Sequence, residues 1–314
     1  METRRLQAFI QMVDTGSLTR AAQILGIAQP ALSQQVAMME ADFGAQLLVR
    51  SRQGVSPTPA GRVLYRHAQI ILRQLNQART EVSRSVDELS GTVHIGLPLT
   101  AAAVLSVPLL EAAAARYPSI VLFLADGLPG NLLNEFTMNG RVDIGLLPGN
   151  VVATGITVRR LLRERLALVA ARDSAFGDSD APLPMKALEG TPLVLPEPAN
   201  RVRQAVDTAF ASIGVVPNVV AEMNSVYSLC AAAAAQLGVA IVPAAGWAVA
   251  DTRLVARMLV EPEIERPLHI AYSNAAPLMP PVKAIHDLII SVTEDLIAAG
   301  AWPGARLSPD DSAP

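Results

Sequence analysis

Residues 17–44, SLTRAAQILGIAQPALSQQVAMMEADFG, decide the fold of the N-terminal part of this chain. They contain two short helical patterns with a turn between them. Ser17 suits the N-cap of the first helix, Gly26 suits its end, and Pro30 suits the first turn of the second helix. In the second helix, apolar residues recur every three or four positions and predict a buried face: Leu32, Val36, Met39 and Phe43.

The opposite face of the second helix carries small, hydroxyl and amide side chains: Gln29, Ser33, Gln34 and Ala37. Side chains of this reach can pair with base edges and thymine methyl groups in the major groove. This is what the second helix of a helix-turn-helix motif does. An ordinary helical hairpin with a polar outer face would show the same pattern, so the pattern alone leaves both interpretations open.

A short basic hairpin is predicted directly after the second helix. Leu47 and Val49 alternate as a strand, and a turn follows at Gly54, with Arg50 and Arg52 on its approach. Such a hairpin, or wing, can lie along DNA phosphates or enter a minor groove. The wing therefore favours the DNA-binding interpretation of the two helices before it.

From Leu6 to Gly61 the chain resembles the winged helix-turn-helix of LysR-type transcriptional regulators. The resemblance rests on Gly-Ser-Leu-Thr-x-Ala-Ala in the first helix, Gln-Pro-Ala-Leu-Ser-Gln-Gln in the second, and Thr-Pro-Ala-Gly after the wing. Within the family, the runs IAQPALSQQVA, RSRQGVSPTPAGRVLYRHA and IVLFLADGLPGNLLNEF are most similar to the nitrogen assimilation control subgroup. Members of that subgroup are regarded as acting without an obvious small-molecule inducer.

The resemblance implies a sequence-specific regulator that binds double-stranded DNA as a homodimer or homotetramer at an interrupted palindrome, with RNA polymerase as a further partner. We expect the second helix to read bases, the wing to hold the backbone or the minor groove, and the start of the first helix to contact phosphate. The full expected set of DNA-binding residues is Ser17, Thr19, Arg20, Gln29, Pro30, Ser33, Gln34, Arg50, Arg52, Pro57 and Thr58.

A long helix is predicted after the wing, with Thr58 and Pro59 as its cap and first-turn residues. Its apolar residues repeat at alternating steps of four and three, as in a coiled coil: Leu64, Ala68, Ile71, Leu75, Ala78 and Val82. An amphipathic helix packed on its own chain would show the same stripe. The resemblance implies a dimerisation helix over residues 59–90, after a winged helix-turn-helix domain over residues 1–58.

After the linker helix, strands alternate with helices, which predicts parallel sheets with right-handed crossovers. The resemblance implies an α/β effector-binding domain over residues 91–300, made of two subdomains of the periplasmic-binding-protein type. One would contain residues 91–161 and 268–300, and the other residues 162–267. Residues 301–314, rich in Pro, Asp, Ser and Gly, are predicted to be disordered.

Ligands of open α/β sheets gather at the carboxyl ends of strands, where helix N-termini offer unpaired N–H groups. This rule gives a set of effector-binding candidates: Leu99, Thr100, Asn200, Arg201, Asn224 and Ser225, with Arg203 as a second cation for a carboxylate. Capping of a helix explains Thr100, Asn200 and Ser225 equally well. The run LPLTAAAVLS around Thr100 is poor in hydroxyls, which argues against a tightly bound polar effector.

Charge is unevenly distributed along the chain. The net charge is −3, yet residues 1–90 carry +3, from ten Arg and seven acidic residues, and residues 91–314 carry −6. A basic N-terminal module on an acidic body fits DNA binding. The single cysteine, Cys230, excludes an internal disulfide and lies in an apolar run, so we expect a buried structural thiol in a reducing compartment.

No enzyme motif is present: we find no Gly-x-Gly-x-x-Gly after a strand, no P-loop and no Gly-x-Ser-x-Gly, and the histidines lack metal-ligand spacing. We therefore expect no catalytic residue, metal or cofactor. Residues 1–18 do not form a secretory signal, and the apolar stretch 223–250 divides into helix, glycine and strand, so a cytoplasmic protein is expected. The alternative function is a small-ligand-binding protein whose N-terminal helices serve only for dimerisation.

Overall fold

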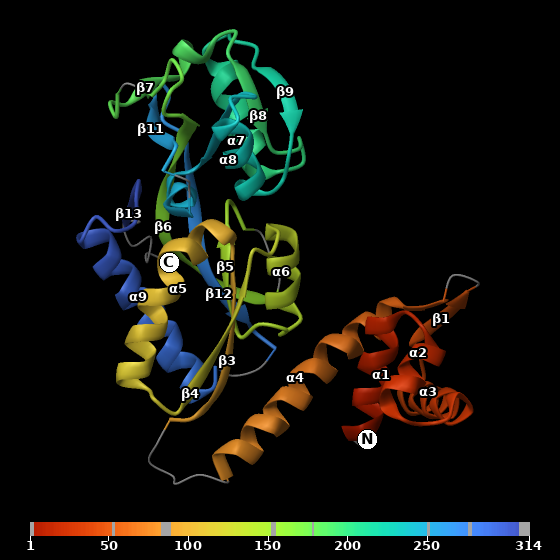
Figure 1. Cartoon of the computed structure of the whole chain (residues 1–314). Coiled ribbons are helices and arrows are strands. Elements are labelled where there is room, and N and C mark those ends of the chain that lie inside the picture. The colour runs from red at the N-terminus through yellow and green to blue at the C-terminus, as the bar shows by residue number, and fades with distance from the viewer. Residues whose placement is uncertain are drawn as a thin grey trace.

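The computed structural model describes residues 3–51, 54–82, 89–151, 155–177, 179–249, 252–275 and 278–307. A small N-terminal domain is joined by one long helix to a larger α/β domain of two stacked subdomains (Figure 1). This is the fold class that the sequence predicts.

The N-terminal domain consists of three helices and a two-stranded hairpin: α1 (Thr3–Thr15), α2 (Leu18–Leu25), α3 (Gln29–Phe43), β1 (Leu48–Ser51) and β2 (Gly54–Pro57). Ser17 caps α2 by accepting a hydrogen bond from the Arg20 backbone N–H at 3.3 Å. Gly26 ends α2 with a φ of 65°, in the left-handed region that glycine tolerates. The helix boundaries therefore follow the predicted cap and stop residues.

The three helices bury one apolar face each, with Phe9, Met12, Leu32 and Met39 fully inaccessible. Phe43 is an exception, because the prediction placed it in the core and its side chain is 47% exposed. The chain turns back after Gly44, where the Glu40 carboxylate accepts hydrogen bonds from two backbone N–H groups, those of Leu47 and Leu48. These two leucines complete the core, and the last turn of α3 lies outside it.

Helix α4 (Pro59–Val82) begins at Thr58, whose hydroxyl accepts a hydrogen bond from the Gly61 N–H at 2.9 Å. It leaves the N-terminal domain and runs beside the first subdomain of the α/β domain (Figure 1). Helix α4 thus contacts both domains.

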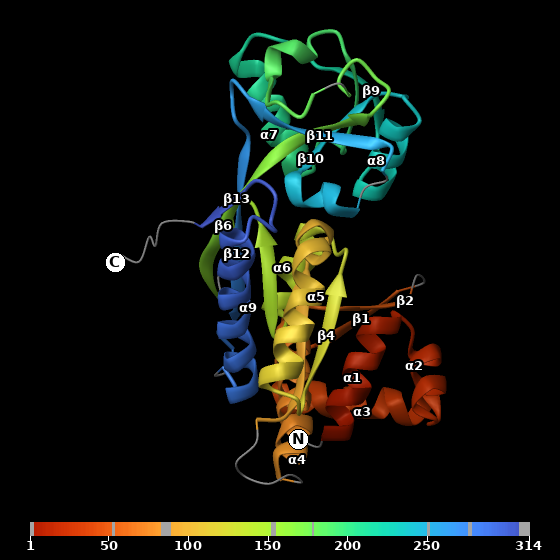
Figure 2. The same cartoon turned by 60° about the vertical axis from the view of Figure 1, so that its left-hand side comes forward.

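The strands of the α/β domain lie in the order β4 (Ile120–Asp126), β3 (Gly91–Leu97), β5 (Ile144–Pro148), β12 (Glu265–Ser273), β6 (Ile156–Ala171), β10 (Val239–Pro243), β8 (Pro192–Leu195) and β9 (Asn218–Glu222). The long strands β6 (Ile156–Ala171) and β12 (Glu265–Ser273) pair antiparallel, and the far half of β6 pairs with strands of the second subdomain. These crossing strands connect the two subdomains, which lie one above the other in Figure 2.

The first subdomain contains parallel strands with helices on both faces: β3 (Gly91–Leu97), β4 (Ile120–Asp126), β5 (Ile144–Pro148), α5 (Leu99–Arg116), α6 (Gly130–Met138) and α9 (Pro280–Ala298). Helices α5 and α9 share one core with the sheet, and α6 covers the opposite face (Figures 1 and 2). The parallel strands that the alternating β and α patterns predicted are therefore confirmed.

The second subdomain has its own core, around Phe210 and Ile241. Its elements are β7 (Leu183–Pro184), η1 (Met185–Leu188), β8 (Pro192–Leu195), α7 (Arg201–Ser212), β9 (Asn218–Glu222), α8 (Val226–Ala234), β10 (Val239–Pro243), η2 (Ala244–Val249) and β11 (Leu254–Val260). Residues 223–249 of the apolar stretch fold here as helix, strand and short helix. Cys230 is buried in α8, and burial raises the pKa of its thiol.

The prediction of disorder from residue 301 is wrong for residues 301–307. Trp302 is only 2% exposed and belongs to the core of the first subdomain, and β13 (Ala305–Leu307) pairs with β6. Burial of one large aromatic side chain outweighs the composition of the residues around it. Residues 308–314 lie outside the described part of the chain.

Candidate nucleic-acid interface and ligand site

The outer face of α3 is open. Gln29, Pro30 and Gln34 are exposed and Ser33 is half-buried. Within the described part of the chain, no hydrogen bond involves the side chains of Gln29, Ser33 or Gln34. The polar groups predicted to read bases are therefore free, and the core on the other side of α3 holds them on a rigid element.

The wing, formed by β1 and β2, is fixed to the loop between α1 and α2. The Val55 N–H donates to the Gly16 carbonyl oxygen at 2.8 Å. A Cβ atom on Gly54, where φ is +125°, would lie 2.3 Å from the same oxygen, so only glycine fits there. Arg50 is exposed on the wing, whereas Arg52 lies outside the described residues.

The predicted phosphate contacts differ in how free their side chains are. Thr19 and Arg20 are exposed in the first turn of α2, and Ser17 caps that helix. Pro57 is half-buried at the end of the wing. Thr58 was expected to contact DNA, but its hydroxyl donates to the Gln46 carbonyl at 2.6 Å and also caps α4. The Thr58 hydroxyl is thus used within the fold, and its contact with DNA stays a prediction.

The predicted dimerisation stripe on α4 needs a correction. Leu64 and Ala68 are 7% and 0% exposed, because the first turns of α4 complete the core of the N-terminal domain. Ile71 is 42% exposed, Ala78 is exposed and Leu75 is half-buried. Val82 belongs to the helix, but its side chain lies outside the described set. The open apolar stripe therefore starts later than the sequence predicted.

Thr100 lies at the start of α5 among charged groups that the sequence analysis did not single out. Its buried hydroxyl accepts a hydrogen bond from Arg266 Nη2 at 2.9 Å. Arg266 Nε in turn donates to Glu164 Oε1 at 2.6 Å, and Glu164 is 0% exposed. Leu99 is half-buried beside Thr100. The start of α5 is thus tied to the crossing strands by a buried ion pair.

The first turns of α5 and α8 meet at η2. A Cβ atom on Gly246 would lie 2.9 Å from Thr100 Cγ2 and 3.3 Å from Val226 Cγ1. Two of the predicted strand ends are therefore brought together at the junction of the subdomains.

The remaining candidates at this junction mainly hold the fold. Asn200 caps α7 and Ser225 caps α8, as the capping alternative predicted. The Asn224 side chain accepts from the Glu197 N–H at 3.3 Å. Arg201 reaches across the junction and donates to the Asn150 carbonyl.

Arg203 was the second candidate cation. Its guanidinium donates to Asp207 at 2.9 Å and to Glu222 at 2.9 Å, so two carboxylates of the chain already neutralise its charge.

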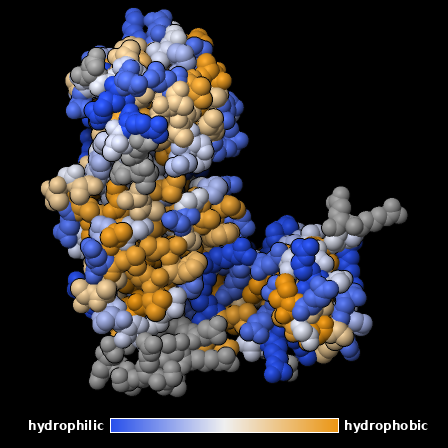
Figure 3. Space-filling view, viewed as in Figure 1, coloured by the Kyte–Doolittle hydropathy of each residue, from blue (hydrophilic) through white to orange (hydrophobic). Residues whose placement is uncertain are grey.

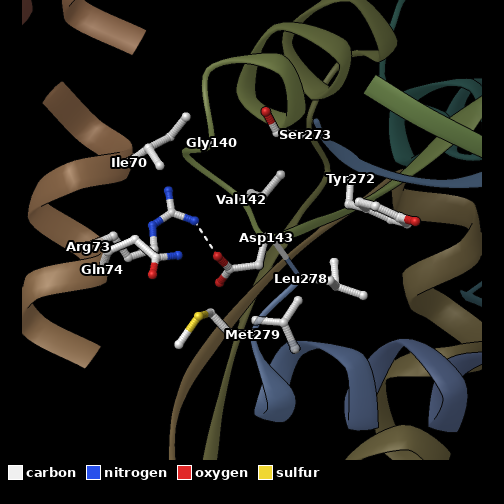
Figure 4. A pocket seen from close by; sticks show the side chains of 11 residues that line it. Ile70, Arg73, Gln74, Gly140, Val142, Asp143, Tyr272, Ser273, Leu278 and Met279 are labelled. Atoms are coloured by element: carbon white, nitrogen blue, oxygen red, sulfur yellow. Dashed lines mark hydrogen bonds and ion pairs between the residues drawn. The ribbon is translucent and has the colours of Figure 1, made fainter. Parts of the chain in front are cut away.

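A small hollow is found elsewhere, between α4 and the first subdomain (Figure 4). Its volume is about 50 Å³, room for a few water molecules and not for an effector. Its lining includes Ile70, Arg73, Gly140, Asp143 and Met279. Over the described ranges, no three His, Cys, Asp or Glu side chains cluster so as to hold a metal ion.

Comparison with known proteins gives a consistent result for both domains. Residues 3–62 match the bacterial regulatory helix-turn-helix proteins of the lysR family, and residues 87–294 match the LysR substrate binding domain. The chain is 38% identical to the nitrogen assimilation regulatory protein nac of Escherichia coli strain K12, over 93% of this chain and 95% of that protein. It is 36% identical to the protein of the same name from Klebsiella aerogenes, with the same coverage.

Two solved structures share the whole fold. A full-length OxyR variant from Pseudomonas aeruginosa superposes with a TM-score of 0.67 at 19% identity, covering 93% of this chain and 97% of that one. Full-length CbnR complexed with its target DNA superposes with a TM-score of 0.67 at 20% identity, covering 93% of this chain and 100% of that one.

Proposed function

Because this chain belongs to the LysR family of DNA-binding transcriptional regulators, we propose that it binds an interrupted palindrome as a dimer or tetramer and adjusts transcription from nearby promoters. The family consists of regulators and not of enzymes. The observation that carries the proposal is the exposed, unpaired face of α3 with Gln29, Ser33 and Gln34. A ligand binder with purely dimerising N-terminal helices is disfavoured, because residues 3–62 match the regulatory helix-turn-helix family.

The test is genomic footprinting followed by binding measurements on the recovered duplexes. A regulator of this kind should bind a footprinted duplex with an affinity that falls steeply as salt rises, with a slope of about −0.9 per phosphate neutralised. It should bind a scrambled duplex of equal length and composition much more weakly. Equal affinity for the two duplexes, or no footprint at all, would overturn the proposal.

The proposed oligomer rests on two apolar surfaces. One is the open part of α4, with Ile71, Leu75 and Ala78. The other lies on α5 and the edge strand β4, where Val107 is 63% and Val121 61% exposed. Among the described helices, only α5 is long and apolar enough to cross a membrane, and its apolar residues are only partly covered. Exposed apolar area of this extent favours contact with another copy.

Figure 3 supports the second surface, since apolar atoms gather over the first subdomain in that view. We propose residues 59–90 as the unit that pairs the DNA-binding domains, residues 1–58, and we propose that α5 and β4 pair the effector-binding domains, residues 91–300. The start of α4 at Pro59, directly after the wing, supports the first limit.

For the effector-binding domain, we propose the subdomain junction as the effector site, near Leu99, Thr100, Asn200, Arg201, Asn224 and Ser225. The meeting of the α5 and α8 N-termini supports it. The engagement of Arg201, Asn200 and Ser225 within the fold argues against a strongly polar ligand.

A thermal-shift screen of carboxylates and aromatic acids tests the site. A shift that Thr100→Val abolishes would support it, and no response from any compound would favour an effector-free regulator. We further propose RNA polymerase as a partner and the cytoplasm as the location, since a regulator acts where transcription takes place.

A further inference from the structure

We propose that the loop Asn139–Asp143, between α6 and β5, is a latch that holds the linker helix and α1 against the first subdomain and so sets the angle of the DNA-reading helix. The latch goes beyond the proposed function, because it concerns how the two domains are coupled within one chain. Three contacts support the latch. Each joins residues of the loop to the N-terminal domain or to α4, which together we call the DNA-binding unit.

The first contact is the ion pair between Arg73 of α4 and Asp143 (Figure 4). Their side chains are 22% and 11% exposed, so solvent screens the pair only weakly. The other carboxylate oxygen of Asp143 accepts the His94 backbone N–H at 2.8 Å. One carboxylate thus joins α4 to the first strand of the effector-binding domain.

Asp143 remains charged under ordinary conditions. Burial would raise its pKa, but the hydrogen bonds from His94 and the charge of Arg73 outweigh burial and hold the pKa below the usual value of 3.8. The ion pair is therefore intact at neutral pH, and mild acidification does not release it.

The second contact is made by Arg141. Its guanidinium donates to the Asp14 carboxylate of α1 and, at 2.6 Å, to the Tyr65 hydroxyl of α4. The Tyr65 hydroxyl also donates to Asp14. The guanidinium lies 5.7 Å from the centre of the Tyr65 ring and 5.0 Å from that of Phe136. A single arginine from the effector-binding domain is thereby bound by two helices of the DNA-binding unit.

The third contact is close packing at Gly140. Its φ is +65°, which disfavours any residue with a side chain, and a Cβ atom there would lie 2.8 Å from Ile70 Cγ1, so Ile70 of α4 would have to shift. Gln69, with its amide oriented to suit its neighbours, donates to the Asn139 carbonyl at 3.2 Å and accepts from Arg141 Nε at 3.0 Å. Shape and hydrogen bonding therefore select one position of the helix on the loop.

The chemical composition of the interface between the loop and the DNA-binding unit suits a latch that can be released. It consists of ion pairs and polar hydrogen bonds around one small hollow, without a large apolar core. Small polar contacts between domains usually permit relative motion. Domain movement here would break a few charge-assisted bonds and expose little apolar surface.

The latch is also connected to the subdomain junction. Asp143 is followed directly by β5, whose five residues end at Pro148. The next residues, Gly149 and Asn150, contact Arg201 of the second subdomain. The latch and the junction thus lie at the two ends of one short strand, so a rotation of the second subdomain that moves Asn150 pulls on the loop.

Charge reversal at the Asp14–Arg141 pair tests the latch. Both side chains are about one-third exposed, at 33% and 36%, so each single change leaves the cores intact. Asp14→Arg and Arg141→Asp should each enlarge the radius of gyration of the full chain in small-angle X-ray scattering. The double exchange should restore the wild-type value. Lys186→Gln, an exposed charge in the second subdomain, is the control and should change nothing.

Two outcomes would overturn the latch: single variants that melt normally and scatter like the wild type, or a double exchange that fails to restore the wild-type scattering. Arg73→Gln, which leaves Asp14 and Arg141 untouched, gives a second variant should a reversal fail to fold. It should also enlarge the radius of gyration, and a normal value would count against the latch.

A second readout uses DNA and rests on the proposed function. Inserting about half a helical turn between the half-sites places them on opposite faces of the duplex. The affinity of the wild type should then fall about 100-fold. The affinity of the Arg141→Asp variant should fall only about 10-fold, because its domains reorient more freely. Equal losses with intact wild-type binding would contradict the latch alone, whereas failure of the wild type to bind DNA would contradict the proposed function.

Discussion

At the scale of single residues, Gln34 and Arg50 separate base reading from backbone binding. Gln34 is exposed on α3, and Gln34→Ala should cost about 1 to 3 kcal/mol at a cognate duplex and relax sequence choice. Arg50→Ala should weaken all duplexes alike and lower the salt slope by about 1. Competition gel shifts over a salt series measure both effects. Unchanged selectivity in Gln34→Ala would show that another residue reads the bases.

The buried pair of Arg266 and Glu164 gives a second test at this scale. Glu164 is 0% exposed, and Arg266→Met would leave its carboxylate without that partner, at a cost of about 3 to 5 kcal/mol. Adding Glu164→Leu should recover most of the loss, because the buried charge is then gone. Urea denaturation measures the free energy of unfolding. A single variant as stable as the wild type would mean that the carboxylate finds another partner.

Arg266 and Glu164 also show which contacts could not be predicted from the sequence. The strand-end rule found Thr100, whose hydroxyl does lie at the subdomain junction. It missed Arg266 and Glu164, which face each other on neighbouring strands and are 102 positions apart along the chain. Cross-strand pairing over that distance leaves no local pattern in the sequence.

At the scale of elements, Trp302 and β13 extend the fold beyond the predicted end. Trp302→Ala should cost about 3 to 5 kcal/mol, because it empties a site in the core of the first subdomain. Trp302→Phe should cost much less, since the indole N–H has no hydrogen-bond partner among the described residues. Thermal and urea melts compare the two. Equal, small losses would mean that residues 301–307 add little to stability.

Helix α4 shows what a periodic pattern predicts and what it leaves open. Apolar residues at steps of three and four predicted the helix correctly over Pro59–Val82. Residues 89 and 90, which the prediction included, are not helical, and residues 83–88 lie outside the described part of the chain. The same spacing continues from Leu64 and Ala68, which pack inside the N-terminal domain, to Ile71, which is open. Periodicity marks an apolar face but not what covers it, so the sequence placed Leu64 and Ala68 in the proposed dimer stripe although the N-terminal core buries them.

The corrected stripe gives a prediction for the linker. Ile71→Asp with Leu75→Asp should halve the mass measured by analytical ultracentrifugation, because charges replace the apolar side chains proposed to pair two copies. Ile24→Asp, at a position 59% exposed on α2, is the matched control and should keep the wild-type mass. Persistence of the wild-type mass in the double variant would remove α4 from the interface.

At the scale of the whole molecule, two subdomains joined by crossing strands could be predicted. The prediction rested on the alternation of strands and helices and on the family resemblance. The docking of the DNA-binding unit on the first subdomain was not predictable in the same way. Arg141 and Asp14 are 127 positions apart, and Arg73 and Asp143 are 70 apart. Such contacts arise only after each domain has folded, and single charged residues in loops carry no periodic signal.

The proposed pairing surface of α5 and β4 gives a test of the dimer against the tetramer. Val107→Arg with Val121→Arg should remove the tetramer in analytical ultracentrifugation. The free energy of association should weaken by about 2 kcal/mol or more if either side chain is central to the interface. Both side chains are more than 60% exposed in the single chain, at 63% and 61%, so the changes should leave the melting temperature unaltered. Leu307→Arg, at a position 46% exposed on β13, serves as the control. A wild-type mass in the double variant would exclude the surface of α5 and β4 from the interface and leave α4 as the proposed pairing surface.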